Sequence, residues 1–337
     1  IWHISVLPIS CGTMKIGFEV FLVVAREMSI TKAANELHIT QQCASDHIKR
    51  LEKEYNVVLF ERRPKFRLTQ AGEIMLHNLL NIQIMETSMS RSLAGIAEGT
   101  VGGFTLGIST SRAPIILPRV LPRYYQCYPK VNISFTEEDT QILEERLLNG
   151  QVDLFIGVNT SPHPDYKIQT LTTDEIILVI SAKLLRREFS KQEIRQMEDG
   201  IDLKRFSNIP FTQSFKTGKV NHAIQEYLDS YNVKLNVIYN ISDSETQILL
   251  CASGICAALC PKMLLAAAYR HNQTCKPEDE LYMFPIRNLG RELKIELVSH
   301  RNAMHPMYIQ DFVHILQEEL PRIADSMSLE ELRKNIQ

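Results

Sequence analysis

Residues 29–72 read SITKAANELHITQQCASDHIKRLEKEYNVVLFERRPKFRLTQAG, and this stretch decides the fold of the N-terminal part of the chain. Its first half predicts two short helices, over residues 30–37 and 41–55, because small and apolar residues recur there with helical spacing. Ser29 and Thr40 are expected as their N-caps, since each hydroxyl can accept from backbone N–H groups of the following turn. Only His38 and Ile39 remain between them, which predicts a helix-turn-helix.

The second of these helices has one apolar stripe and one polar face. Ala44, Ile48, Leu51 and Tyr55 follow one another in steps of four, three and four, so we expect them to be buried. The polar side chains left facing outward are Gln41, Gln42, Ser45, Asp46, Lys49 and Lys53. A helix in this position enters a major groove, where glutamine pairs with adenine edges and lysine or arginine reaches guanine or phosphate.

The second half of the stretch predicts a basic wing. Residues 57–60 are apolar, residues 62–67 carry four cations around a proline, and the chain returns through Phe66 and Leu68. Between residues 40 and 70, seven Lys and Arg side chains outnumber four acids, whereas the whole chain has a net charge of −2. Local positive charge on a slightly acidic protein is what binding to a phosphate backbone requires.

Residues 18–72 resemble the winged helix-turn-helix of the LysR-type transcriptional regulators, through AANELHITQQ, IKRLE, LFERR and RLTQAG. The resemblance implies a sequence-specific DNA-binding regulator. The DNA-contacting residues expected from it are Thr31, Thr40, Gln41, Gln42, Ser45, Lys49, Arg50, Arg62, Arg63, Lys65 and Arg67. Gln42 stands where the family often has proline, and Asp46 stands where a basic or amide side chain is common. Asp46 therefore either accepts from a cytosine amine or lies off the DNA.

Length and composition limit what the rest of the chain can be. A chain of 337 residues suits two or three domains, and its content of 45% hydrophobic and 23% charged residues is that of a globular protein. No run of eighteen apolar residues or signal peptide is recognisable, so we expect a cytoplasmic protein without contact to a membrane. Residues 1–13 precede Met14, and we expect them to be a non-native or upstream extension.

Residues 73–98 form a strongly apolar helical pattern, and Gly95, Gly99, Gly102 and Gly103 are expected to break that helix and start a hinge. The resemblance identifies this segment as a linker helix that pairs with a second copy of the chain. It implies a dimer or tetramer, an operator that is an inverted repeat of double-stranded DNA, and RNA polymerase as a further partner.

From residue 104 the pattern alternates between strand and helix, which predicts an α/β domain whose first part is a parallel sheet with right-handed crossovers. LPRV, NGQVDLFIG and ASGICAALCPKML also resemble the family's effector domain, which implies two α/β lobes and two crossover strands, like a periplasmic binding protein. The expected domains are residues 14–72, the linker 73–99, the effector-binding domain 100–325, and a tail 326–337. The expected strands are 104–109, 131–138, 152–158, 175–181, 209–214, 235–241, 255–260, 280–286 and 292–299, and the expected helices are 114–129, 141–149, 220–231, 244–253 and 307–325.

Hydroxyl-bearing residues follow several of these strands, at the sheet edge where such folds bind ligands. The residues expected to bind a small effector are Ser109, Thr110, Ser111, Asp139, Thr140, Thr212, Gln213 and Ser214, with the cation Arg112 beside the first three. Hydroxyls and N–H groups at helix starts favour an anion. In the family, positions matching Ser111, Thr140 and residues 212–214 line the inducer cleft. The alternative is that these hydroxyls only cap helices.

Other function classes have little support. We find no G-x-S-x-G, HExxH, Walker or dinucleotide motif, and no CxxC or histidine pair with metal-ligand spacing, so we expect no catalytic residues, cofactor or metal. Seven cysteines without regular spacing indicate a reducing compartment. Cys251, Cys256 and Cys260 could sense oxidants, but their apolar surroundings favour buried free thiols. A cytoplasmic small-molecule-binding protein without a gene-regulatory role is the alternative function.

Overall fold

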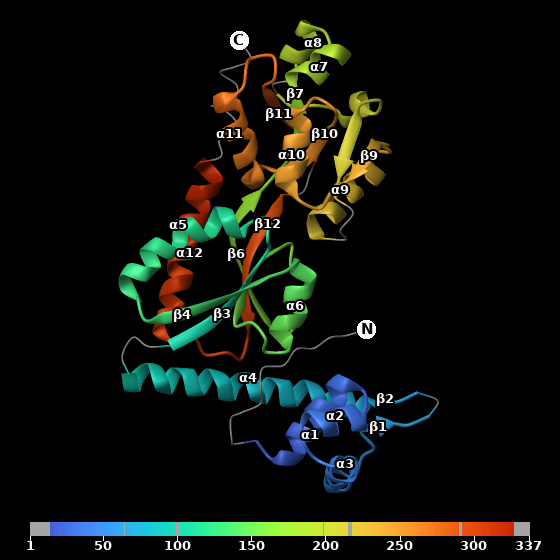
Figure 1. Cartoon of the computed structure of the whole chain (residues 1–337), viewed down its shortest axis with the longest axis vertical. Coiled ribbons are helices and arrows are strands. Elements are labelled where there is room, and N and C mark those ends of the chain that lie inside the picture. Colours follow the sequence, from blue (N-terminus) through green and yellow to red (C-terminus); the bar gives the residue numbers. More distant parts are fainter. Residues whose placement is uncertain are drawn as a thin grey trace.

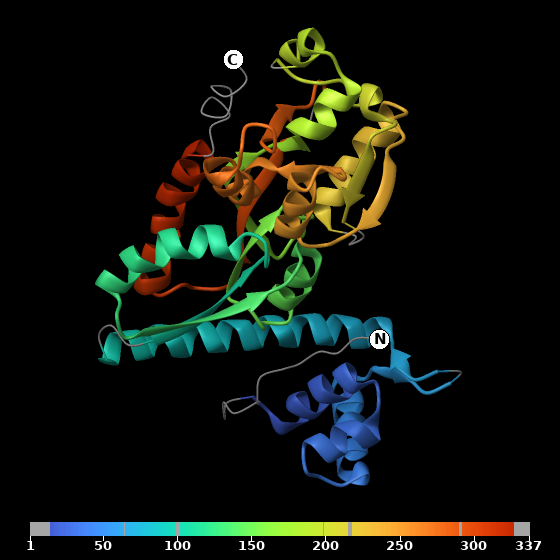
Figure 2. The same ribbon diagram turned by 45° about the horizontal axis from the view of Figure 1, so that its top comes forward.

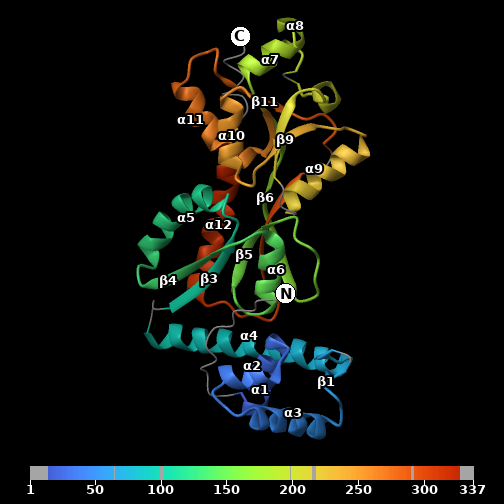
Figure 3. The same ribbon diagram turned by 45° about the vertical axis from the view of Figure 1, so that its right-hand side comes forward.

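The computed structural model describes residues 14–63, 65–98, 102–197, 199–214, 218–289 and 292–326. It is elongated, with a small helical head at one end, a long helix crossing beside it, and two α/β lobes stacked beyond that helix (Figures 1 and 3). Within these residues, no helix is long and apolar enough to cross a membrane. The residues expected to be an N-terminal extension, 1–13, and nearly all of the tail lie outside the described part.

The head consists of α1 (Ile16–Glu27), α2 (Ile30–Glu36) and α3 (Gln41–Tyr55). Both predicted N-caps are confirmed, because the Ser29 hydroxyl accepts from Lys32 N at 3.3 Å and the Thr40 hydroxyl accepts from Cys43 N at 3.1 Å. Ala33 and Ala44 are fully buried, so the helices can approach closely. Tyr55 was expected in the core but is 48% exposed. It is the last residue of α3, and Asn56 then turns the chain away with φ 53°.

The predicted wing is a two-stranded ladder of β1 (Phe60–Glu61) and β2 (Arg67–Leu68). The Phe66 ring stacks on Phe60 at 5.0 Å between centroids, and Phe60 packs against Phe21 of α1, so aromatic contacts fix the wing to the head. Gly72 lies where a Cβ atom would be 2.2 Å from the Leu59 carbonyl oxygen. Only glycine allows this close approach between the strand and the helix that follows.

The long helix, α4 (Gln70–Glu98), has 29 residues and begins three residues earlier than expected. Its first turn is fixed by the Thr69 hydroxyl, which accepts from Gly72 N at 3.0 Å. The helix passes through Gly95, which was expected to break it, because one glycine costs only about 1 kcal/mol in a helix. Gly102 and Gly103, expected in a hinge, are the first residues of a strand. Gly99 lies outside the described residues.

The lobe beside α4 is a mixed sheet with the strand order β4-β3-β5-β12-β6. Its strands are β3 (Gly102–Ile108), β4 (Val131–Glu137), β5 (Leu154–Val158), β6 (Tyr166–Asp174) and β12 (Leu293–His300). The predicted parallel pairing is confirmed for β3 with β4 and β5, whereas β12 pairs antiparallel with both neighbours. Its helices are α5 (Ala113–Cys127), α6 (Thr140–Leu148) and α12 (Met307–Ser326). Alternate residues of β5 face α5 and α12 on one side and α6 on the other.

The second lobe is a mixed sheet with the order β11-β7-β10-β8-β9. Its strands are β7 (Ile176–Ser181), β8 (Pro210–Gln213), β9 (Asn236–Asn240), β10 (Ala257–Pro261) and β11 (Leu281–Pro285). The helices α9 (Lys219–Ser230) and α10 (Ser244–Ala252) were predicted. Sequence patterns did not reveal β6 and three helices, α7 (Ala182–Glu188), α8 (Lys191–Arg195) and α11 (Ala266–Thr274).

Two connections join the lobes, one from β6 into β7 through Glu175 and one from β11 into β12. The long helix α4 lies against the lobe formed by β3 to β6 (Figure 2). At this junction the Ser88 hydroxyl donates a hydrogen bond to the Met304 carbonyl oxygen and accepts one from Met304 N at 2.8 Å. A change in that lobe therefore has a direct physical route to the helix that carries the head.

Candidate functional site

The outer face of α3 and the wing form one candidate surface. Of the eleven residues expected to contact DNA, ten are exposed and Ser45 is half-buried. The Thr40 hydroxyl accepts from Cys43 N as an N-cap, and its own proton remains available to another group. Asp46, which is half-buried, lies 3.9 Å from the Lys49 ammonium. An exposed pair at this distance reduces the positive charge that Lys49 presents.

The cations of this surface differ in how far acids neutralise them. Arg67 Nε bonds Glu61 Oε2 at 2.6 Å across the wing strands. Among the described residues, no carboxylate is paired with Arg50, Arg62, Arg63 or Lys65. Unpaired and exposed, these four side chains carry the charge that the surface presents to a phosphate backbone.

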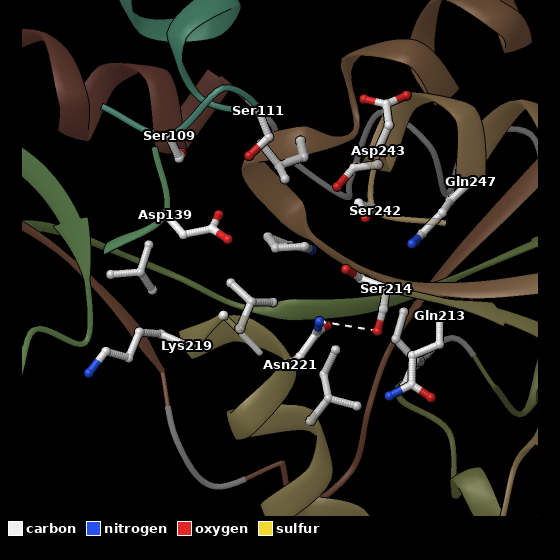
Figure 4. A pocket seen from close by; sticks show the side chains of 18 of the residues that line it. Ser109, Ser111, Asp139, Gln213, Ser214, Lys219, Asn221, Ser242, Asp243 and Gln247 are labelled. Atoms are coloured by element: carbon white, nitrogen blue, oxygen red, sulfur yellow. Dashed lines mark hydrogen bonds between the residues drawn. The ribbon is translucent and has the colours of Figure 1, made fainter. Parts of the chain in front are cut away.

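A cavity of about 240 Å³ lies between the two α/β lobes. It is lined by the carboxyl end of β3, the starts of α5 and α6, and the second lobe's β8, α9 and α10. All eight residues expected to bind an effector line this cavity, so the structure brings together groups that are up to 105 positions apart in the chain. Figure 4 shows five of them, with Ser109, Ser111 and Asp139 facing Gln213 and Ser214 across the cavity.

The expected lining residues are not equally available to a ligand. The Thr140 hydroxyl accepts from Val158 N at 3.1 Å and the residue is 8% exposed, so it holds the start of α6 against β5. Ser214 offers its carbonyl oxygen to the Asn221 side chain at 3.2 Å, the interaction dashed in Figure 4. Asp139 does not use its side chain to cap α6. The alternative that these side chains only cap helices therefore does not describe Thr140 or Asp139, because neither side chain forms a cap hydrogen bond at the start of α6.

Arg112, which lines the cavity, forms a buried ion pair with Asp174. Arg112 Nη2 lies 3.4 Å from Asp174 Oδ2, and the two side chains are 3% and 2% exposed. The other carboxylate oxygen accepts from Met263 N at 3.1 Å and from Glu175 N at 2.9 Å. Burial raises the pKa of Asp174, and the Arg112 charge opposes that shift. The pair fixes the β3–α5 loop to the strand that crosses into the second lobe.

A second ion pair spans the lobes at the cavity rim. Lys219 at the start of α9 donates to the Ser161 hydroxyl at 2.6 Å and lies 3.4 Å from Glu144 of α6. Ser161 N donates to the same carboxylate at 2.7 Å. The side chains of Lys219 and Glu144 are 17% and 13% exposed, so the contact is largely shielded from solvent. It holds the lobes together on one side of the cavity.

Several lining residues were not expected from the sequence, namely Lys219, Asn221, Ser242, Asp243, Ser244 and Gln247. They lie at the starts of α9 and α10 or just before them. The reasoning used for the first lobe, that polar residues at helix starts after strands line a ligand site, could have found them. The three neighbouring cysteines, Cys251, Cys256 and Cys260, are buried free thiols, as their apolar surroundings predicted.

No group of three or more metal-ligating side chains suited to a metal ion occurs among the residues that the structure describes.

A head with an exposed helix-turn-helix and basic wing, joined by a long helix to a two-lobed domain with a polar cavity, defines the class of DNA-binding regulators with a ligand-binding domain. Residues 97–321 match the family described as LysR substrate binding domain, and residues 17–73 match the bacterial regulatory helix-turn-helix protein, lysR family. This chain belongs to the LysR family of DNA-binding transcriptional regulators. The family assignment confirms the expected regulator and excludes the alternative of a binding protein without a regulatory role.

Individual proteins agree with this assignment. The HTH-type transcriptional activator CmpR of Synechocystis sp. is 29% identical over 229 residues, which cover 68% of this chain and 72% of CmpR. Full-length OxyR C199D of Pseudomonas aeruginosa superposes with a TM-score of 0.58 at 16% identity, covering 89% of this chain and 96% of that one. Full-length CbnR complexed with its target DNA gives 0.53 at 18% identity, covering 90% and 99%. These two likenesses concern the fold.

Proposed function

We propose that this regulator reads an inverted-repeat operator as a dimer, with α3 in the major groove and the wing on the adjacent backbone. The observation that carries the proposal is the set of exposed cations without acid partners in the described chain, Arg50, Arg62, Arg63 and Lys65, beside the amides Gln41 and Gln42. Arginine and lysine supply phosphate contacts, and glutamine supplies base readout. The family assignment, and the similarity of the fold to CbnR in complex with its target DNA, support DNA as the partner.

The proposed dimer forms through α4. Five large apolar side chains of this helix are exposed, with steps of eight, three, four and four that place them on one side: Ile74, Ile82, Met85, Met89 and Leu93. Exposed apolar surface of this extent marks an interaction site. A second copy paired along it would carry its own head, and the two-fold symmetry of the pair would require two-fold symmetry in the operator.

The proposed regulation starts in the cavity between the lobes. A small effector would contact the hydroxyl and amide groups that line it, among them Ser111 and Thr212, and would bind differently to different angles between the lobes. The lobe beside α4 would pass that difference to the helix through the Ser88–Met304 contact. An effector shifts the regulator only if it binds one arrangement more tightly than the other. Such a regulator acts in the cytoplasm, where bacterial DNA is.

The test is selection of duplexes from a random-sequence library by the full chain, followed by affinity measurements at several salt concentrations. We expect enrichment of an inverted repeat. Arg63→Ala should weaken binding to it and reduce the slope of log affinity against log salt by about 1, since one phosphate contact is lost.

Lys130→Ala is the matched control, because Lys130 is exposed on the lobe beside α4 and far from the head in sequence. It removes the same charge and should leave both affinity and slope unchanged. Failure to enrich any repeat, or equal weakening by the two variants, would count against the proposed reading surface.

A further inference from the structure

Among the residues that the structure describes, four ionisable side chains line the cavity between the lobes, and both cations of this set are paired with protein carboxylates. Arg112 is paired with the buried Asp174 at 3.4 Å. Lys219 is paired with Glu144 at 3.4 Å and donates to the Ser161 hydroxyl. Figure 4 shows the Lys219 side chain extending away from the centre of the cavity. An anionic ligand would therefore have to compete with a protein carboxylate for either cation.

The two acids differ from each other. Asp243 Oδ2 accepts from Thr246 N at 2.7 Å and from the Thr246 hydroxyl at 2.5 Å, so it is used to cap α10. Asp139 has no hydrogen-bond or ion-pair partner among the residues that the structure describes. Its carboxylate points toward the interior of the cavity in Figure 4. Within the described part of the cavity, the one charged side chain without a protein partner is therefore negative.

Helix starts, which favour anions, are largely compensated here. At α5, the N–H groups of Arg112 and Ala113 both donate to the Ser109 carbonyl oxygen at 3.0 Å, and Pro114 has no N–H group. At α10, Asp243 supplies a carboxylate, and α6 begins directly after Asp139. Acidic residues at these positions offset the positive end of the helix dipole. The sequence favoured an anionic effector because it shows where the helices start. It does not show which protein groups already pair with the N–H groups and cations at those positions.

The cavity wall also contains buried polar atoms that lack a partner within the described chain, Ser109 Oγ, Arg112 Nε and Thr212 Oγ1. Arg112 and Thr212 are only 3% and 2% exposed. Arg112 Nε is solely a donor, and a buried donor left unpaired costs about 1–3 kcal/mol. A ligand with an acceptor oxygen would satisfy groups of this kind.

We propose that the effector is a small amine that also bears acceptor oxygen atoms, such as an amino acid, with its ammonium group at Asp139. Its acceptor oxygen lies toward Arg112 of the first lobe and Thr212 of the second, which also line the cavity. This proposal rests on the proposed function of the cavity as the effector site and specifies its ligand class. A dicarboxylate suits the cavity less, because its second carboxylate would take the place of the ammonium group and would meet the like charge of Asp139.

The experiment is a thermal-shift series on the full chain with four linear compounds of equal carbon number: γ-aminobutyrate, putrescine, butanediol and succinate. We expect γ-aminobutyrate to raise the melting temperature most and putrescine less, with no effect of succinate. Asp139→Asn should raise the Kd for γ-aminobutyrate about tenfold or more, because a charge-assisted hydrogen bond becomes a neutral one. Asparagine is as good a helix N-cap as aspartate, so this variant should fold.

Glu137→Gln is the control, since Glu137 is an exposed carboxylate on the neighbouring strand outside the cavity. It should leave every shift unchanged. The proposal is overturned if succinate stabilises the protein as strongly as γ-aminobutyrate. It is equally overturned if Asp139→Asn binds the amine as well as the parent, or if neither amine stabilises folded protein at millimolar concentration.

The readout needs no DNA, so the two proposals fail separately. Amine binding without operator selection would contradict the proposed DNA-reading function. Operator selection without amine binding would contradict only the proposed class of ligand.

Discussion

Asp174 is a buried carboxylate that is paired with a buried cation. Its side chain is only 2% exposed, and its carboxylate accepts hydrogen bonds from two backbone N–H groups and pairs with the Arg112 guanidinium. Removing one partner of a buried ion pair leaves the other charge without compensation, which costs more than the pair contributes over an apolar replacement. This contact ties the loop that carries Ser109 and Ser111 to the end of β6, so it contributes to the geometry of the cavity.

Asp174→Asn should lower the free energy of unfolding by about 3–5 kcal/mol. The amide can still accept from Met263 N, so the change isolates the charge. Urea denaturation of the full chain measures the effect. Glu175→Gln removes the neighbouring carboxylate, which is 45% exposed and paired with Lys262 at 3.1 Å, and should cost less than about 1 kcal/mol. Similar losses for the two variants would show that the buried pair does not hold this loop.

Gly72 allows the wing to lie against the start of α4. Gly72→Ala should destabilise the protein by about 1–3 kcal/mol and weaken DNA binding, since the added Cβ would be 2.2 Å from the Leu59 carbonyl oxygen. Gly17→Ala is the control, because Gly17 lies inside α1 and its added Cβ would meet the Leu51 side chain at 3.5 Å, an ordinary van der Waals distance. Thermal melting and operator affinity together check the prediction. An unchanged melting temperature for Gly72→Ala would contradict it.

At the scale of elements, the junction between α4 and the first lobe is rich in titratable groups. A second cavity of about 230 Å³ lies there, and His300 at the end of β12 is 97% buried beside it. The facing groups are Glu73 and His77 from α4, and His163 and Asp165 from the segment before β6. His77 Nε2 and His163 Nδ1 lie 3.5 and 3.7 Å from Asp165 Oδ2.

Acidification should loosen this junction. Burial lowers the pKa of His300, and the neighbouring His77 and His163 lower it further, while Asp165 opposes them. When the folded-state pKa of a histidine is lowered, the fold keeps its full stability above the unfolded-state pKa of about 6.5. Stability is then lost as the pH falls from that value through the lower folded-state pKa. Urea denaturation at about pH 7.5 and about pH 5.5 brackets the transition.

His300→Asn should lose less stability than the parent between these two pH values, because the asparagine does not titrate. Both proteins contain His77 and His163, so the difference between the two isolates His300. An equal loss of stability in the parent and the variant would contradict the role assigned to His300.

At the scale of the whole molecule, the apolar side of α4 decides the assembly. Met89 is 55% exposed on that side, between Met85 and Leu93. Met89→Glu should raise the dissociation constant of the dimer at least about tenfold, because a charge would be buried at the pairing surface. Operator affinity should fall with it. Met307→Glu, at a methionine that is 65% exposed at the start of α12, should change neither. Analytical ultracentrifugation measures the dimer, and unchanged association of Met89→Glu would rule out pairing along this side.

The sequence by itself determined the elements and their local signals. The caps Ser29 and Thr40, the basic wing, the long apolar helix and most strands were predictable, because each depends on residues within a few positions of one another. The eight expected cavity residues could be gathered by one rule, that ligands bind at the carboxyl ends of strands. The prediction that Tyr55 is buried was wrong because a local pattern does not show where the helix leaves the core. The prediction that Gly95 ends the long helix was wrong because the pattern does not show whether a helix tolerates one glycine.

Only the tertiary structure decided how the charges are paired. Arg112 and Asp174 are 62 positions apart, and Lys219 and Glu144 lie on different lobes, so no spacing in the sequence could show that these cations are already neutralised. Asp139 and Asp243 each stand directly before a predicted helix, so the sequence does not distinguish them. In the structure Asp243 caps its helix, whereas Asp139 makes no cap hydrogen bond and faces the cavity. Charge pairing depends on distances of a few ångströms between distant segments, and those distances exist only in the folded chain.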